Sequence, residues 1–347
     1  MDKTDRLRDY GLAFLLYEQG LGVCGYELIR ELFIFVKLIL NSYLVKFLFV
    51  SFVVLVSFTS CYDEYTNDYE TPNMGFAVAN PLRTVIADRD MPIYIGVSIG
   101  GKREVDMSDW AKFEIDPSLV EETGKVLLPS NYYTLSDQEY FRVRKSNLPV
   151  ADVRIDFTEA FYNDPLCLEA HYVLPFRMTE NSLGALREGA ETTVAVIKYI
   201  STYAGTYYRM GKVTEVDASG IAIGQPVSYG DTYDIINCST VAFNSKAPRI
   251  VVCPGVGNEK EGVGSVTLSM DADKNVSVTG VDGKAAISNA SGSYKIEGDY
   301  EYVADVTKRA PQFDLEYTYE KAGKYYHVVE KLVLRQDPLY DLRVETW

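Results

Sequence analysis

The chain has 347 residues, enough for about two domains, and a net charge of −15. Apolar residues make up 47% and charged residues 24%, which is typical of a packed globular protein and excludes a disordered chain. Six acidic and six basic residues precede Cys61, so the 28 basic and 43 acidic side chains that follow carry the whole net charge. This negative field repels a polyanion, so we expect no nucleic-acid partner.

Residues 32–58 are almost continuously apolar, and their uncharged part, Phe47–Thr59, is 13 residues long. A membrane span needs ~20 residues, so this length is typical of the core of a signal peptide. The Ser60-Cys61 step that follows resembles the lipobox of bacterial lipoproteins. The resemblance implies that residues 1–60 are a targeting segment and that Cys61 is acylated. An uncleaved signal anchor is the alternative.

Residues 1–31 fit no signal peptide, because acidic residues stand where basic ones are expected, so the start codon is a candidate for misassignment. Residues 61–72 are polar and aperiodic, which predicts a flexible lipidated tether. The acidic tract 63–68 resembles the export signal of Bacteroidota lipoproteins. That resemblance implies a lipid anchor in the outer membrane, with the protein on the cell surface.

From residue 73 to 202 the apolar pattern alternates with period two between frequent turn residues. The segments Met91–Ile99, Val150–Phe157, Cys167–Leu174 and Glu191–Ile200 are predicted strands, and Glu180–Glu188 is the one predicted helix. Short strands at this spacing favour an immunoglobulin-like β-sandwich. We place the end of this domain near residues 201–205.

Two blocks of this region resemble a known family. Val126–Leu135 contains an "LP-x-x-Y" block and Tyr172–Arg177 a "YVLP" block. Both are similar to blocks of the immunoglobulin-like N-terminal domain of unknown function in Bacteroidota surface lipoproteins. That family is associated with SusC/SusD-type glycan importers, so the resemblance implies a role in a polysaccharide utilisation system.

Residues 205–347 restart the alternating pattern with about eight successive segments separated by turn signals such as Asp282-Gly283. This succession predicts an up-and-down β-barrel, so the expected fold class of the whole chain is all-β. The blocks Phe313–Tyr319 and Tyr325–Leu332 resemble a lipocalin-like C-terminal domain. The alternative to a barrel is that residues 205–347 form a second β-sandwich.

The sequence offers little for metal or thiol chemistry. His171 and His327 are the only histidines and lie in different predicted domains, so we expect no zinc site. Cys167, Cys238 and Cys253 remain after the targeting segment. Either Cys238 pairs with Cys253, or all three are buried thiols.

A calcium loop and catalysis are equally unsupported. Asp271, Asp273 and Asn275 have the spacing that opens a calcium loop, but Val276 stands where that loop needs Gly. The chain lacks a G-x-S-x-G elbow, a P-loop and a dinucleotide fingerprint. We therefore predict no catalytic residues, no metal, no cofactor and no enzymatic activity.

The 27 tyrosines suggest aromatic surfaces for a ligand. Tyr229 shares a loop with Gln225, Asn258 lies in the glycine-rich loop 255–264, and Trp110 follows a polar turn. Aromatic rings beside amides are the chemistry that a neutral sugar needs. We predict a non-enzymatic glycan-binding accessory that partners a polysaccharide or oligosaccharide and a SusC/SusD-type importer. A structural or adhesin-like surface protein that binds other proteins is the alternative.

Overall fold

The computed structural model describes residues 28, 30–35, 71–102, 104–145, 147–259, 264–280, 286–340, 342 and 345–346. Met1–Asp68 and Tyr69–Trp347 are two compact units. Residues 28 and 30–35 are helical, while the rest of the expected targeting segment, Cys61 and the tether to residue 70 lie outside the described residues. In the described part of the chain, no helix is long and apolar enough to cross a membrane.

The first sheet begins at residue 73 and is almost wholly antiparallel. Its strands are β1 (Asn73–Gly75), β2 (Pro81–Ile86), β3 (Ile93–Gly100), β4 (Trp110–Ile115), β5 (Val126–Leu127), β6 (Tyr133–Leu135), β7 (Tyr140–Val143), β8 (Val150–Phe157), β9 (Tyr172–Asn181), β10 (Thr192–Ile200) and β22 (Glu345–Thr346). Its short helices are η1 (Pro117–Val120), η2 (Ser130–Tyr132), α5 (Glu159–Asn163) and η3 (Pro165–Leu168).

This sheet curls around one apolar core, as a sandwich or half-barrel does. The strand order is β1-β3-β8-β7-β4-β9-β10-β2-β22. In β3, buried Ile93, Ile95, Val97 and Ile99 alternate with more exposed residues, as the period-two pattern predicts. Phe141 lies in the middle of this core, with its ring centroid 4.4 Å from that of Phe113.

The two recognised blocks meet at one carboxylate. Tyr132 of the first block and Tyr172 of the second donate their hydroxyls to Asp164 Oδ2, at 3.1 and 2.7 Å. Asp164 also accepts from the amide of Leu166 and so caps η3. These blocks therefore join secondary-structure elements within the sheet.

Two predicted elements of this region are wrong. Cys167 belongs to η3 and not to a strand, because Pro165 and the Asp164 cap begin a 3₁₀ turn there. The predicted helix at Glu180–Glu188 is absent: β9 continues to Asn181, which pairs with Ala111, and turns follow. Gly184 and Gly189 have φ values of 77° and 73°, which end any regular helix.

The second sheet is the predicted up-and-down barrel, nearly closed. Its strands are β11 (Gly205–Val216), β12 (Val227–Tyr229), β13 (Ser239–Ala247), β14 (Ile250–Pro254), β15 (Ser265–Met270), β16 (Val276–Gly280), β17 (Ile287–Lys295), β20 (Gln312–Lys321) and β21 (Lys324–Leu334). Outside it lie η4 (Ile235–Asn237), the hairpin β18 (Glu301–Tyr302)–β19 (Asp305–Arg309) and η5 (Pro338–Tyr340).

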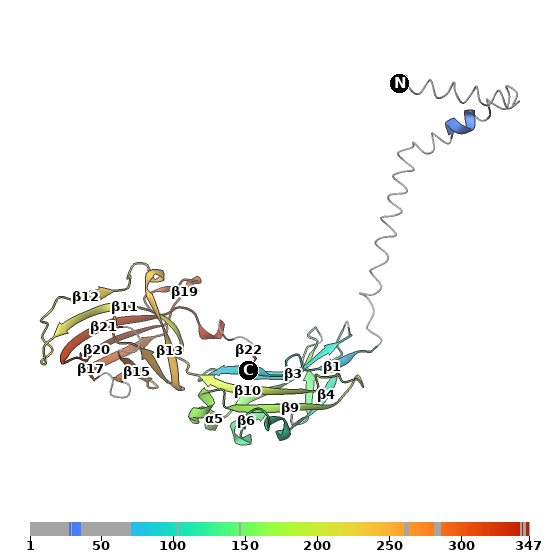
Figure 1. Ribbon diagram of the computed structural model, residues 1–347, viewed down its shortest axis with the longest axis horizontal. Helices are drawn as coiled ribbons and strands as arrows, with labels where there is room; N and C mark the ends of the chain where they lie inside the picture. The colour runs from blue at the N-terminus through green and yellow to red at the C-terminus, as the bar shows by residue number, and fades with distance from the viewer. Residues whose placement is uncertain are drawn as a thin grey trace. The chain divides into compact units, whose positions relative to one another are not determined.

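The barrel strands follow the order β16-β15-β14-β13-β11-β21-β20-β17, and Figure 1 shows β11, β21, β20 and β17 side by side. The two end strands touch through an antiparallel bridge between Asn275 and Ser293. Gly292 permits this closure, because a Cβ there would lie 3.0 Å from Val276 Cβ. The interior is filled by side chains, among them Tyr207, Phe243 and Phe313.

The three described cysteines are free and buried. Cys253 lies inside the barrel, whereas Cys238 packs in a small cluster formed with Tyr208, Met210 and Val333. Cys238 and Cys253 therefore lie in different clusters and form no disulfide with each other, which confirms the alternative that all three cysteines are buried thiols. Burial raises the pKa of Cys253 to about 12, so this thiol stays protonated at neutral pH.

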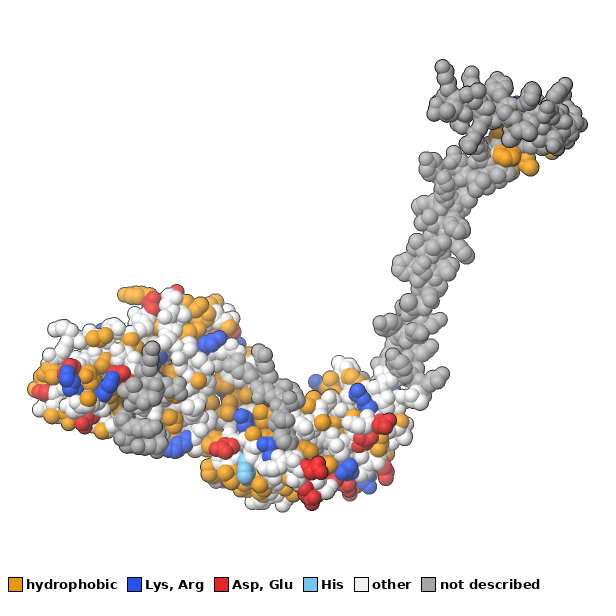
Figure 2. All heavy atoms as spheres, viewed as in Figure 1, with side chains coloured by type: hydrophobic (Ala, Val, Ile, Leu, Met, Phe, Trp, Pro, Cys, Tyr) orange, Lys and Arg blue, Asp and Glu red, His pale blue; other side chains and the backbone are white. Residues whose placement is uncertain are grey.

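Several contacts cross the predicted boundary at residues 201–205. The C-terminal strand β22 pairs with β2, Arg89 donates to Asp337 at 2.8 Å, and Arg249 pairs with Asp88 at 2.5 Å. On the face that Figure 2 presents, acidic and basic side chains of the described residues are interspersed with apolar ones. That residues 73–202 and 205–347 fold independently stays a prediction.

Candidate functional site: a recess in the barrel wall

The barrel wall opens where three strands change partners. On one edge of β11, β13 pairs along Gly205–Arg209, and β12 replaces it along Gly211–Val213. The pairing of β13 with β14 reaches Asn244 and Val252, while β14 continues to Pro254 beside β15. The first half of β13 and the end of β14 therefore separate, and a recess forms between them.

The recess has a volume of about 380 Å³, which is near the lower end of the ~300–1,000 Å³ usual for ligand pockets. Backbone and side chains of β13, the end of β14 and the loop after it form most of its walls. The lining residues are Arg209, Tyr229, Ser239, Thr240, Val241, Ala242, Asn244, Pro254, Gly257, Asn258 and Glu259.

An ion pair lies at the floor of the recess. Arg209 Nε donates to Glu330 Oε2 at 3.0 Å, and the two residues are 6% and 1% exposed. Tyr229 donates its hydroxyl to the same oxygen at 3.0 Å, and Tyr317 donates to Oε1 at 2.8 Å. Each carboxylate oxygen therefore has at least one donor, as a buried charge requires.

Tyr229 and Arg209 both keep their protons at neutral pH. Burial, followed by the charge of Glu330, raises the pKa of Tyr229 far above its usual value. Burial by itself lowers the pKa of Arg209, but the Glu330 carboxylate outweighs that effect and the pKa is raised. Both groups are consequently hydrogen-bond donors at any physiological pH.

The loop after β14 packs partly into the barrel core. Val256 is 1% exposed and belongs to the barrel core, and the Gly257 amide donates to Tyr317 at 2.8 Å. Gly257 has φ of 53°, and a Cβ there would lie 2.9 Å from Val213 Cγ2. A glycine is therefore required where the loop enters the barrel.

Four side chains around the recess have hydroxyl or amide groups that bond to no other described residue. They are Ser239, Thr240, Asn244 and Asn258, all exposed. By contrast, Glu259 at the rim pairs with Lys321 Nζ at 2.5 Å. The recess thus combines paired charges with free neutral donors and acceptors.

The structure brings together two of the four predicted ligand residues. Tyr229 and Asn258 both line the recess, although Tyr229 is half-buried and its hydroxyl is bound to Glu330, so its ring is a wall and not an exposed platform. Gln225 is exposed before β12 and lies outside the lining. Trp110 begins β4 of the other sheet, where its ring packs edge-on against Tyr140, with 5.4 Å between the ring centroids.

Sequence reasoning missed Arg209 and Glu330. A signal was available, because each is a charged residue at an inward position of an alternating apolar strand: Tyr207 and Val213 share the inner face of β11, and Val328 and Leu332 that of β21. The register pairs Arg209 with Leu332 and places Glu330 opposite Gly211. Ser239, Thr240 and Asn244 gave no comparable signal.

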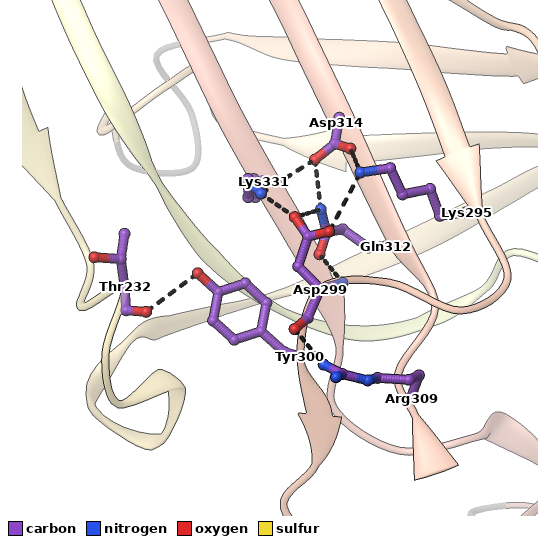
Figure 3. Close-up of polar contacts among 8 residues, drawn as sticks. All are labelled: Thr232, Lys295, Asp299, Tyr300, Arg309, Gln312, Asp314 and Lys331. Atoms are coloured by element: carbon purple, nitrogen blue, oxygen red, sulfur yellow. Dashed lines mark hydrogen bonds and ion pairs between the residues drawn. The ribbon is translucent and has the colours of Figure 1, made fainter.

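A second polar cluster lies on the outside of the barrel (Figure 3). Asp299 accepts from Gln312 Nε2 at 3.1 Å and pairs with Lys295 at 3.4 Å and with Lys331. Figure 3 also shows that Asp314 of β20 accepts a hydrogen bond from Gln312 Nε2, and that the Tyr300 hydroxyl donates to the carbonyl of Thr232. Because its charges satisfy one another, we assign it to holding the segment before β18 against β20 and β21.

This outer cluster makes a pH-dependent contribution to stability. Lys331 above all, and then Gln312, hold the pKa of Asp299 well below its usual value. A lowered folded-state pKa gives stability that is present above the unfolded pKa of ~3.9 and is lost as pH falls through the folded value. We expect Asp299→Asn to lower Tm at pH 7, with the difference from wild type shrinking below about pH 4. Calorimetry from pH 7 to 2 measures this.

Asp273→Asn, in an exposed turn, is the matched control. A difference between Asp299→Asn and wild type that stays constant down to pH 2 would contradict the assignment.

A larger cavity of about 740 Å³ is lined by residues of both sheets, among them Tyr162, Phe157 and Arg249. Several of its charges are paired: Arg249 with Asp88 at 2.5 Å, and Asp156 with Arg154 at 2.7 Å. The smaller recess has the greater share of free hydrogen-bonding groups, so we take it as the candidate site.

Comparisons with known proteins agree with an all-β fold. A family model described as a "-like, N-terminal domain" matches residues 59–184. A crystal structure of a protein of unknown function from Bacteroides ovatus shares 19% identity and a TM-score of 0.65, covering 81% of this chain and 99% of that one. This likeness shows the fold alone.

Two further Bacteroides ovatus structures were found. One, a multidomain protein including DUF1735, has 13% identity and a TM-score of 0.41, covering 80% of this chain and 99% of that chain. The other, of unknown function, has 13% identity and a TM-score of 0.42, covering 80% of this chain and 100% of that chain. No curated protein matches the sequence significantly.

Proposed function

We propose that the protein is a lipid-anchored cell-surface protein that binds a glycan, without modifying it, in the recess of its barrel. The observation that carries this proposal is a concave site lined by four residues, Ser239, Thr240, Asn244 and Asn258, whose polar side-chain groups bond to none of the described residues. Sugars are recognised by a few well-placed hydroxyls and amides beside apolar walls. Tyr229, Val241, Ala242 and Pro254 supply such walls.

Binding without catalysis is supported by the state of the nearby carboxylates. Glycosidases need a pair of carboxyl groups free to donate and accept protons. Glu330 is held by Arg209 and two tyrosine hydroxyls, and Glu259 is paired with Lys321. The acidic chain, at −15 overall, does not oppose a neutral ligand.

Filling the recess is the direct test. We expect Ser239→Trp to abolish glycan binding, because Ser239 lines the recess and is the register partner of Arg209, so both side chains lie on the same face of the paired strands β11 and β13. Thr279→Trp is the matched control, since Thr279 is an exposed residue of β16 outside the lining. The protein in detergent is applied to a glycan array, followed by calorimetry on each hit. Equal binding by the two variants, or no binding by wild type, would exclude the recess.

Removing a single amide side chain should reduce glycan affinity less than filling the recess does. Asn258→Ala removes one or two hydrogen bonds worth ~0.5–1.5 kcal/mol each, so we expect affinity to fall about 2- to 12-fold per bond. Asn131→Ala, at an exposed position of η2 in the other sheet, should leave the affinity unchanged.

The lipid anchor is part of the proposal. Acylation of Cys61 would attach the protein to the outer membrane, since several acyl chains give stable membrane attachment where a single one is marginal. We expect Cys61→Ser to leave the protein unprocessed or released, as measured by mass and by membrane fractionation. A Cys61→Ser protein that is processed and membrane-bound like wild type would contradict the anchor. Association with a SusC/SusD-type importer rests on the family resemblance.

One observation favours a second function, binding of another protein. Ile221, Ile223 and Val227 are 65%, 64% and 57% exposed around the turn between β11 and β12. Neighbouring exposed aliphatic residues are typical of interaction surfaces. If Ile221→Ser and Ile223→Ser together abolish attachment to a surface partner while glycan binding persists, the adhesin-like function gains support.

A further inference from the structure

We propose that the recess takes the end of a neutral glycan chain, inserted end-on, and does not bind the middle of a chain. This inference rests on the proposed function and specifies its ligand. Three properties of the recess carry it: a closed floor, a small volume and, among the described lining residues, the pairing of both charged side chains.

The floor closes the recess toward the barrel interior. Arg209 and Glu330 are 6% and 1% exposed, and behind them Tyr317 is fully buried. Val256 fills the adjoining part of the barrel, and the Gly257 amide is bonded to Tyr317. A chain therefore cannot pass through the barrel, and a ligand that reaches Tyr229 enters and leaves by the same opening.

The walls limit what enters. β13 bounds the recess on one side through Ser239–Ala242, and Pro254 with the loop 257–259 bounds the other. A volume of about 380 Å³ suits a small ligand or one end of a larger one. The interior of a polysaccharide would need an open groove along which the chain continues in both directions.

The charges of the lining select an uncharged sugar. Arg209 is neutralised by Glu330, and Glu259 by Lys321 at 2.5 Å. The other described lining residues are uncharged, and four of them have hydroxyl or amide groups that bond to no described residue. A uronate carboxylate in this recess would lose hydration without gaining an unpaired cation, and the −15 net charge repels it further.

Chain length separates the two modes of binding. The probes are glucan, mannan and galactan oligosaccharides of two, four and eight units, their parent polysaccharides and oligogalacturonate, measured by calorimetry on the protein in detergent. For whichever neutral series binds, we expect Kd per chain to change less than about twofold from four to eight units. The reason is that the number of chain ends does not increase with chain length. Oligogalacturonate should bind at least tenfold more weakly.

The same titrations distinguish the two possible failures. A Kd per chain that falls in proportion to chain length, with binding still lost in Ser239→Trp, would overturn end-on insertion and leave the glycan site in place. Oligogalacturonate binding as tightly as the neutral series would overturn the selection of neutral sugars. Binding by no member of the panel, or binding unchanged in Ser239→Trp, would overturn both the inference and the proposed function.

Discussion

Replacing Glu330 with alanine should lower the free energy of unfolding by ~3–5 kcal/mol, the usual effect of removing one partner of a buried ion pair. The substitution leaves the guanidinium of Arg209 buried without its counter-charge and removes the acceptor of the Tyr229 and Tyr317 hydroxyls. Urea unfolding with linear extrapolation measures the change. Glu320→Ala, at an exposed position of β20, should change stability by less than about 0.5 kcal/mol.

A double substitution separates two effects of removing Glu330: an unpaired charge left buried at Arg209, and the loss of the hydrogen bonds to the carboxylate. Arg209→Met combined with Glu330→Leu replaces both charges by apolar groups, which is often neutral or stabilising for a buried pair. We therefore expect the double variant to be more stable than Glu330→Ala. Tyr229→Phe, which withdraws a single donor, should cost ~1–3 kcal/mol. If Glu330→Ala were within about 0.5 kcal/mol of wild type, the ion pair would have no structural role.

Phe141→Ala should destabilise the first sheet by ~3–5 kcal/mol, because it leaves a cavity in a fully buried aromatic cluster. Besides stacking on Phe113, the Phe141 ring contacts Phe76 and Phe176, each at 5.7 Å between centroids. Phe141→Leu keeps most of the volume and should cost clearly less. Thermal and urea unfolding of both variants provide the measurement.

The Phe141 variants also test whether the two sheets unfold separately. If residues 73–202 and 205–347 are independent, Phe141→Ala should shift one transition and leave glycan binding by the barrel unchanged. A single shifted transition, with binding lost in the same range, would show that the contacts of Arg89 with Asp337 and of Arg249 with Asp88 couple the sheets.

Strands whose alternation is regular could be predicted from the sequence. Val150–Phe157 is predicted and observed with the same bounds, and the succession of segments after residue 205 is enough to indicate an up-and-down barrel. Glu180–Glu188 could not be predicted correctly, because pairing with β4 draws the start of this segment into β9. Tertiary pairing overrides local helix preference there.

The candidate site was only partly predictable. Tyr229 and Asn258 stand out as residues that suit a sugar, and the fold places both on one recess. The recess itself arises because β12 takes over an edge of β11 from β13, which no local pattern encodes. Thr240 and Asn244 are ordinary exposed strand residues until the separation of β13 from β14 makes them part of a wall.

The most direct measurement is a crystal structure of the protein with a bound neutral tetrasaccharide from the series that calorimetry identifies. We expect the terminal sugar in the recess, with hydroxyl groups within ~2.7–3.2 Å of the side chains of Ser239 or Asn258. The rest of the chain should extend away from the opening into solvent. A sugar bound at any other surface, with the recess empty, would contradict the central claim.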